Sequence, residues 1–335
     1  MVADGPRSGQ PARDGVNVAI GALYGRKPAP GRRQPTPVIA KMPPMPQLSL
    51  LLPEWQGYGV DAAVAGGARA LAGALAQARA LAEPGTVAAE AFVTVESPGE
   101  ERLTVEDGVL GLAALVRQAG QTIDTINAHR PSRIFTIGGT CGAELGPVGY
   151  LNQRYRGDLA VVWLDAHADL NTPVTSPSAH FHGMVLRTLL GDGPETLVRL
   201  VPRRLGPEQI ILAGVRELDR DEAVFVSDAA ISRLGPADLL VPDRVTGRVR
   251  ATSFTKVYVH LDLDVLDPKE FPDALMRTAG GVSMDQLVET VQHLDAHFDV
   301  VGFSVVEFRP RTDDAVARAE RLIKRCGIDI GLARS

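Results

Sequence analysis

Short apolar runs alternate with longer amphipathic stretches along most of the chain, from residue 47 onward. Runs typical of buried strands cover residues 48–52, 91–95, 133–137, 159–164, 209–213, 256–261 and 300–306. Helical spacing of apolar residues covers residues 62–82, 109–128, 182–190, 283–297 and 313–325. Strands that alternate with helices imply right-handed crossovers between parallel strands. The pattern therefore predicts an α/β fold, a three-layer αβα sandwich with a mostly parallel central sheet.

Residues 1–44 do not share this pattern. They are rich in Pro, Gly and Arg, and they cannot bury enough apolar surface to offset the entropy of ordering. They also lack the apolar segment and cleavage site of a secretory signal. We expect a disordered extension here, or translation that begins at Met42 or Met45. Because neither a repeat nor a linker follows, residues 45–335 are predicted to form a single domain.

The composition narrows the classes of partner. The 35 Lys and Arg residues against 40 Asp and Glu residues leave a formal charge of −5, which provides no basic surface for nucleic acid. Cys141 and Cys326 are too few for a disulfide framework, so the cytoplasm is the expected compartment. No apolar run approaches the roughly 18 residues of a membrane-spanning helix, so we expect no membrane partner.

Acidic residues follow two of the predicted strands. Asp165, His167 and Asp169 come directly after one apolar run, and Asp262 and Asp264 end another. If the strand geometry persists, residues two apart point the same way. Carboxylates at buried strand ends are unfavourable unless cations or hydrogen bonds compensate them. These acids are either helix caps, turn residues and salt-bridge partners, or they hold divalent ions, and four carboxylates balance two ions of the Mn²⁺, Co²⁺ or Zn²⁺ type.

Five segments carry a resemblance to a known family. They are Gly138–Gly142, Asp165–Pro173, Ser178–Gly183, Asp262–Pro268 and Glu307. In this order and spacing the chain resembles the ureohydrolase family of arginases and agmatinases, over nearly everything from residue 48. The resemblance implies an αβα sandwich that holds two Mn²⁺ ions. It also implies attack of a metal-bridging hydroxide on the guanidinium carbon, which breaks a linear C–N bond and releases urea and an amine.

The resemblance also implies roles for the metal-site residues. Asp165 and Asp262 would bridge both ions, Asp169 would complete one ion, and His167 and Asp264 would complete the other. At the position of the family's first metal-ligating histidine stands Cys141. This cysteine either ligates as a thiolate and favours Zn²⁺ or Co²⁺, or leaves a single firmly bound ion, or is a small buried apolar residue.

The remaining candidates concern the substrate, which the resemblance implies is a small cationic guanidino compound. His182 matches a proton-shuttling histidine and Glu307 matches the acid that binds the guanidinium. Substrate-lining positions are matched by Asn171, Ser178, His180 and Asp219. His180 stands at a position where arginases carry an Asn, and residues 271–277 lack the expected Gly-x-Pro. Both departures argue against ordinary L-arginine as the substrate. Relatives assemble as trimers or hexamers, so we expect a homo-oligomer.

Other interpretations remain at this stage. His260 lies on the same predicted strand as Asp262 and Asp264. It is either a partner behind the ligands, a substitute ligand, or a hydrogen-bonded core histidine. His293 and His297 are read as an ordinary polar helix face. Alternatives to the hydrolase are a catalytically degraded scaffold or binding protein, a hydrolase of an N-hydroxylated guanidine such as hydroxyarginine, and deacetylase chemistry with a single Zn²⁺.

Overall fold

The structure, a computed structural model, describes residues 47–59, 61–82, 92–96 and 103–328. Within this part of the chain an eight-stranded sheet has the order β2-β1-β5-β10-β9-β6-β7-β8, and all its pairings are parallel. Its strands are β1 (Gln47–Leu52), β2 (Val93–Thr94), β5 (Arg133–Gly138), β6 (Ala160–Leu164), β7 (Ile210–Ala213), β8 (Ser232–Leu234), β9 (Lys256–Asp262) and β10 (Asp299–Val306). The prediction for residues 1–44 lies outside the described residues.

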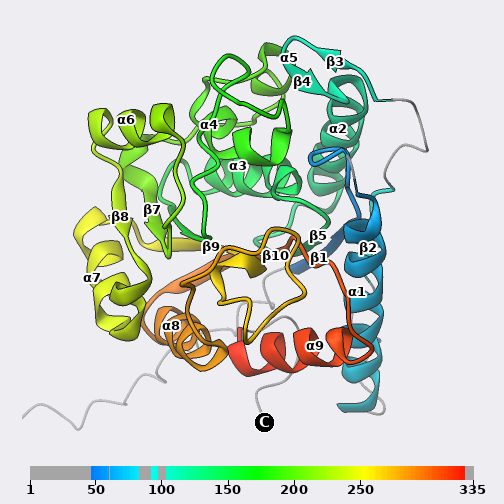
Figure 1. Ribbon diagram of the computed structural model, residues 1–335, viewed down its shortest axis with the longest axis vertical. Coiled ribbons are helices and arrows are strands. Elements are labelled where there is room, and N and C mark those ends of the chain that lie inside the picture. The colour runs from blue at the N-terminus through cyan, green and yellow to red at the C-terminus, as the bar shows by residue number, and fades with distance from the viewer. Residues whose placement is uncertain (1–46, 60, 83–91, 97–102, 329–335) are drawn as a thin grey trace, which may run out of the picture. The chain divides into compact units, whose positions relative to one another are not determined.

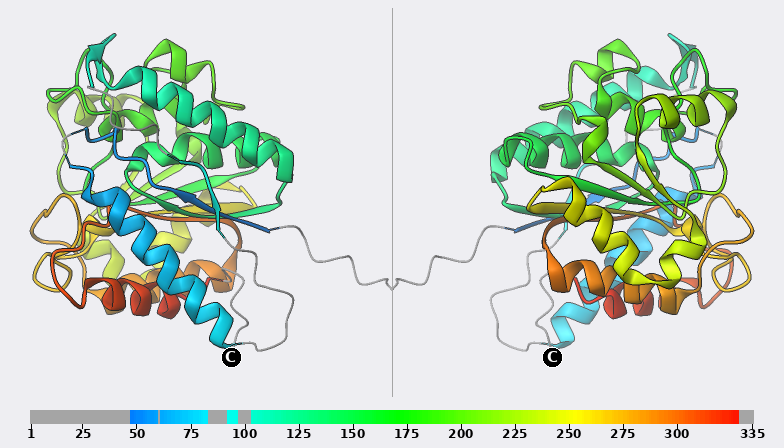
Figure 2. Two further views of the ribbon diagram at one scale, coloured as in Figure 1. Left: turned by 90° about the vertical axis from the view of Figure 1, so that its right-hand side faces the viewer. Right: turned by 90° about the vertical axis from the view of Figure 1, so that its left-hand side faces the viewer.

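Helices cover both faces of the sheet (Figures 1 and 2). On one face lie α1 (Ala63–Ala82), α7 (Pro242–Thr252), α8 (Met284–His297) and α9 (Ala315–Cys326). On the other lie α2 (Leu112–His129), α3 (Leu145–Arg154), α4 (Val185–Leu190), α5 (Glu195–Val198) and α6 (Arg220–Asp228). The three-layer αβα sandwich predicted from the alternation of strands and helices is therefore confirmed.

The central strand β6 shows why its sequence is apolar throughout. Val162 and Leu164 pack into the core on the α1 side, while Val161 and Trp163 pack into the core on the α3 side. A strand that is covered on both faces has no solvent side, so it needs no polar alternation. Within the described residues no helix is both long enough and apolar enough to cross a bilayer.

Some elements differ from the predictions. The helix expected from residue 109 begins at Leu112, because Val109–Leu110 forms strand β4 in a hairpin with β3 (Val105–Glu106), and Gly111 has φ 70°. Helix α3 was not predicted. Its Gly146 and Pro147 argue against a helix in sequence, but Pro is tolerated in a first turn. A Cβ on Gly146 would lie 2.8 Å from Thr122 Cγ2, so the glycine permits close packing against α2.

Candidate metal centre and substrate cavity

The carboxyl ends of four adjacent strands, β5, β10, β9 and β6, meet at one edge of the sheet. Four candidate residues stand at or directly after these ends: Cys141, Glu307, Asp262 and Asp165. Parallel strands bring their carboxyl ends to one edge, where open α/β sheets bind ligands. Residues that are up to 166 positions apart in the chain therefore come into contact, as in the hydrogen bond from Cys141 N to Glu307 Oε1 of 3.0 Å.

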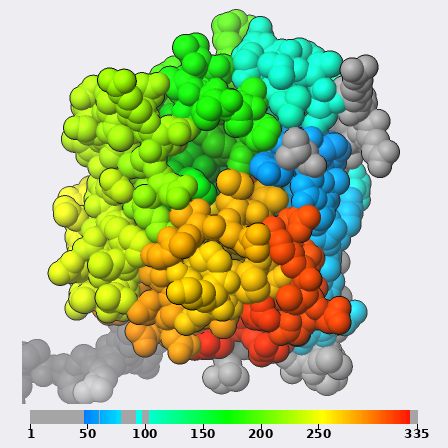
Figure 3. Space-filling view, viewed as in Figure 1, coloured from blue at the N-terminus to red at the C-terminus, as the bar shows by residue number. Residues whose placement is uncertain are grey.

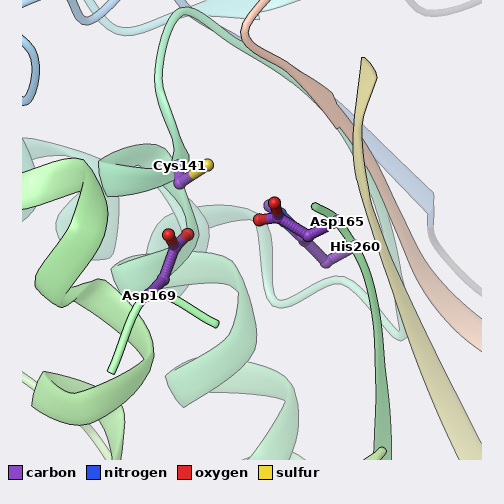
Figure 4. Close-up of side chains that lie close together, drawn as sticks. All are labelled: Cys141, Asp165, Asp169 and His260. Atoms are coloured by element: carbon purple, nitrogen blue, oxygen red, sulfur yellow. The ribbon is translucent and has the colours of Figure 1, made fainter. Parts of the chain in front are cut away.

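Three groups of potential metal ligands result. They are Cys141, Asp165, Asp169 and His260; Cys141, Asp262 and Glu307; and Asp165, His167 and Asp264. In each group one ligand atom of every residue lies within 4.8 Å of the others. All these residues except the partly exposed His167 are buried. Figure 4 shows Cys141 and Asp169 pointing toward Asp165 and His260 across a common space.

The acids meet through turns, so strand geometry does not persist past the strand ends. His167 N donates to Asp165 Oδ1 at 2.6 Å, and Asp264 N donates to Asp262 Oδ1 at 2.8 Å. These bonds between neighbours two apart fold the chain into turns, and Asp264 lies in the 3₁₀ turn η5 (Leu263–Val265). Asp169 has φ 53°, a left-handed conformation that is uncommon outside glycine.

Burial dominates the electrostatics of the acids. Desolvation, reinforced by neighbouring carboxylates, holds the pKa of Asp262 and of Asp169 well above the usual range. For Asp264 the same causes raise the pKa to about 6. Burial and the surrounding acids also hold the pKa of the Cys141 thiol well above its usual range. In the absence of a cation these four groups therefore favour their protonated forms. Burial also acts on Asp165, but hydrogen bonds from His167 and His260 outweigh it and hold the pKa of that carboxyl below its usual range.

The histidine beside these acids behaves in the opposite way. Although burial lowers the pKa of His167, hydrogen bonds and charge from Asp165 and Asp264 raise it to about 12. Its Nδ1 lies 3.0 Å from Asp264 Oδ2 and 3.5 Å from Asp165 Oδ1. The protonated form of His167 therefore compensates the charge of the neighbouring carboxylates, as a bound metal ion would.

The residues present fit divalent cations. Several buried ligand atoms have no hydrogen-bond partner among the described residues, namely Asp169 Oδ2, Asp264 Oδ2, Glu307 Oε2 and His260 Nε2. A buried polar atom without a partner is unfavourable, and an unpaired buried charge more so. Oxygen ligands with imidazole and thiol suit Mn²⁺, Co²⁺ and Zn²⁺. A cation at this edge of the sheet would satisfy atoms that this chain leaves unsatisfied.

Glu307 and His182 stand together beside the acids. Glu307 follows β10 with φ 62°, a conformation that persists only where the surroundings hold it. Its Oε1 accepts a hydrogen bond from Cys141 N and lies 3.3 Å from His182 Nδ1. His182 lies in the 3₁₀ turn η2 (Phe181–Met184), and its side chain is 17% exposed. It therefore lies between a buried acid and solvent.

A cavity of about 130 Å³ opens above this cluster. Its lining includes Asp169, Asp262, Asp264, His167 and His182, and also Asn171, Ser176, Ser178, Asp219, Glu222 and Met276. Figure 3 shows this face hollowed between the green segment and the yellow-to-orange segment. A cavity lined by so many acids favours a cationic ligand.

Three of the four substrate candidates line this cavity. Asn171 Nδ2 donates to Asp219 Oδ2 at 2.8 Å, so these two side chains orient each other. Ser178 lines the wall as well, whereas His180 is not among the lining residues. His180 packs instead against Tyr58, with ring centroids 5.1 Å apart. The predicted polar role of His293 fits the structure, since its Nε2 lies 2.8 Å from Asp243 Oδ1 on the surface.

Sequence reasoning missed three groups. Glu54 follows strand β1 and is buried, with Thr140 Oγ1 and Gly57 N donating to its carboxylate. The strand-end pattern that singled out Asp165 could have found it. Glu144 and Tyr258 form a buried network with His260, and no sequence signal marks it.

The third missed group is the guanidinium of Arg216, which contacts the backbone of two segments that contribute side chains to the cavity lining. Its Nη2 donates to Asp264 O at 2.7 Å and to Thr278 O at 2.6 Å, and its Nε donates to Ala279 O at 3.1 Å. The backbone that carries Asp264 and the backbone that follows Met276 are therefore held by a single side chain.

Comparison with known proteins agrees with this geometry. A family model described as "Arginase family" matches residues 64–329. The chain belongs to the arginase family. It is 32% identical over 201 residues to an arginase of Staphylococcus aureus, and the match covers 58% of this chain and 66% of that relative, slightly less than two thirds.

Two solved structures of the family resemble the fold. An Entamoeba histolytica arginase in complex with L-ornithine is 21% identical with a TM-score of 0.75, covering 85% of this chain and 99% of its own. The Bacillus caldovelox arginase is 24% identical with a TM-score of 0.73 and the same coverage of both chains. At these identities the likeness shows the fold.

Proposed function

We propose that this member of the arginase family is a metal-dependent hydrolase that cleaves a linear C–N bond of a guanidino or amidino compound, with urea as the product from a guanidino compound. The observation that carries the proposal is the convergence of strand-end acids under a cavity that His182 lines, with the buried Glu307 3.3 Å from the His182 ring. No other arrangement of titratable groups on the described residues combines buried unsatisfied acids with an open cavity.

The chain offers ligands for two divalent ions, of which Mn²⁺, Zn²⁺ and Co²⁺ all suit the donor atoms. Asp165 belongs both to the group with Cys141 and Asp169 and to the group with His167 and Asp264, whereas Asp262 lies with Cys141 and Glu307. When bound, such ions lower the pKa of water enough to supply a nucleophile at neutral pH.

Glu307 is proposed to bind the guanidinium. Its Oε2 is buried and accepts no hydrogen bond from the described residues, while its Oε1 is held by Cys141 N. A guanidinium carries N–H donors in a planar fork that matches a carboxylate. The fixed backbone at Glu307 therefore aims one free acceptor at a cationic substrate.

His182 is proposed to donate the proton that the amine leaving group requires. Its Nδ1 faces Glu307 Oε1, and the partly exposed ring also borders the cavity. A histidine exchanges protons readily near neutral pH, which suits both transfer to an amine and recovery of the proton from water. Edge-on packing against Tyr58, with centroids 5.3 Å apart, fixes the ring.

The substrate is proposed to differ from ordinary L-arginine. Met276, from the 271–277 segment that departs from the family pattern, lines the cavity together with the amide of Asn171 and the acid of Asp219. An N-hydroxylated guanidine is one compound of this class. The functional form is proposed to be a cytoplasmic homo-oligomer, a trimer or hexamer.

The test is the release of urea, N-hydroxyurea or an amide, respectively, from a panel of guanidino, N-hydroxyguanidino and amidino compounds after loading with Mn²⁺, Co²⁺ or Zn²⁺. We expect the corresponding product from at least one compound, and loss of at least a hundredfold in Asp264→Asn. His293→Gln, a partly exposed helix position that does not line the cavity, is the matched control and should keep full activity. A folded, metal-loaded protein that releases none of these products would favour a scaffold instead.

A further inference from the structure

One buried imidazole beside the acids, His260, is left by the sequence with three alternative roles, one of them as a metal ligand. His260 lies on β9, is 0% exposed, and stacks on Trp163 with centroids 3.5 Å apart and an interplanar angle of 13°. Its Nε2 has no hydrogen-bond partner among the described residues and lies 3.7 Å from Asp165 Oδ2. The stacked ring therefore aims an unsatisfied nitrogen at Asp165, and Figure 4 shows His260 beside Asp165.

The other nitrogen of the ring is held from behind. His260 Nδ1 lies 3.1 Å from Glu144 Oε1, and Tyr258 OH donates to Glu144 Oε2 at 2.5 Å. A carboxylate needs a donor at each oxygen, so Glu144 fixes a proton on Nδ1 and leaves Nε2 to face the cluster. Histidines that bind metals are oriented in this way by a carboxylate on the far ring nitrogen.

Three further ligand atoms lie opposite. One atom each from Cys141, Asp165, Asp169 and His260 lies within 4.8 Å of all the others. Ligands of one tetrahedral ion at distances of about 2.0 to 2.3 Å lie about 3.3 to 3.8 Å apart, so inward side-chain movements of up to about 1 Å close the set. A thiol, an imidazole and two carboxylates form a four-ligand set of the kind that Zn²⁺ binds.

We infer that His260 is a metal ligand positioned by Glu144, and that with Cys141, Asp165 and Asp169 it forms a buried site that prefers Zn²⁺ or Co²⁺ to Mn²⁺. The inference rests on the metal centre in the proposed function and assigns one of its two positions. Binding converts the Cys141 thiol to a thiolate, and the displaced proton leaves to solvent. The soft sulfur disfavours Mn²⁺, whose preferred ligands are oxygens.

The test is a Co²⁺ titration of the metal-free, full-length protein, followed by absorption spectroscopy. We expect a sulfur-to-cobalt charge-transfer band that Cys141→Ser abolishes. We expect His260→Gln to weaken cobalt binding at this position at least a hundredfold. Glu144→Gln, which keeps the shape of the side chain, is expected to weaken it ten- to a hundredfold. His293→Gln is the matched control and should leave both the spectrum and the affinity unchanged.

Unchanged cobalt affinity and spectrum in His260→Gln would overturn the inference. If that variant fails to fold by circular dichroism, Glu144→Gln and Cys141→Ser decide instead, and wild-type spectra in both would overturn it. Failure of the proposed function looks different, since a thiolate band without hydrolysis leaves the site in place. Conversely, hydrolysis with a His260-independent spectrum leaves the function in place and removes this ligand.

Discussion

Glu54 offers a test of the electrostatics at the edge of the site without altering a proposed ligand. Its carboxylate accepts hydrogen bonds from Gly57 N and Thr140 Oγ1. Its backbone carbonyl lies where a Cβ on Gly139 would approach to 1.8 Å. Glu54 therefore holds the segment that leads from β5 into Cys141. A change in the charge of Glu54 should change the free energy of unfolding.

The magnitude follows from burial. Desolvation, with a smaller contribution from Glu307, raises the pKa of Glu54 from 4.5 to about 7. Because the folded-state pKa is raised, the stability that Glu54 contributes is fully present below about pH 4.5 and is lost as pH rises through about 7. At 1.36 kcal/mol for each pKa unit, the full loss is about 3 kcal/mol, of which about 2.5 kcal/mol falls between pH 5 and pH 8.

The perturbation is Glu54→Gln, which stays neutral at every pH. Its oxygen can still accept from Gly57 N, and the Thr140 hydroxyl can accept from its amide. Urea unfolding with chelator present should show that the free energy of unfolding of the variant, relative to wild type, rises by about 2.5 kcal/mol between pH 5 and pH 8. The exposed Glu195→Gln should shift by less than about 0.5 kcal/mol. A difference for Glu54→Gln that stays constant with pH would refute the reasoning.

Three further predictions follow from the contacts. His182→Ala should lower kcat by about 10² to 10⁴ while metal content, measured by elemental analysis, stays at the wild-type value. Gly67→Ala should lower the free energy of unfolding in urea by more than about 2 kcal/mol, because its Cβ would lie 2.2 Å from Phe308 O. Gly66→Ala, whose Cβ would meet open space, should raise it by about 0.5 to 1 kcal/mol. Equal effects of the two substitutions would contradict the packing. Asp219→Asn should raise KM about tenfold with little change in kcat in steady-state assays, and an unchanged KM would remove Asp219 from the substrate site.

The parts of this fold that follow from the local pattern of apolar and polar residues could be predicted from the sequence. The run from Val161 to Leu164 is apolar because both of its faces are buried, and that pattern predicts a central strand directly. Asp165 and Asp262 could be placed at one edge because parallel strands end together. What failed was the local geometry past the strand ends, since Asp264 turns instead of extending.

The network behind His260 could not be predicted in this way. Glu144 lies 116 positions from His260, and their contact depends on how η1 (Cys141–Glu144) packs over β9. Nothing in the periodicity around Glu144 distinguishes a buried partner from an exposed helix acid. Helix α3 was missed for a related reason, because its glycines are explained by neighbours on other elements.

Arg216 links two properties that protein engineers usually try to vary separately. The same guanidinium donates to the carbonyl oxygen of Asp264, in the acid cluster, and to that of Thr278, in the segment that follows Met276. A loop graft over residues 271–281, made to change selectivity, would therefore also displace the backbone that carries Asp264, a proposed metal ligand. Such chimaeras should exchange turnover for selectivity unless the incoming loop presents carbonyl groups in the same positions.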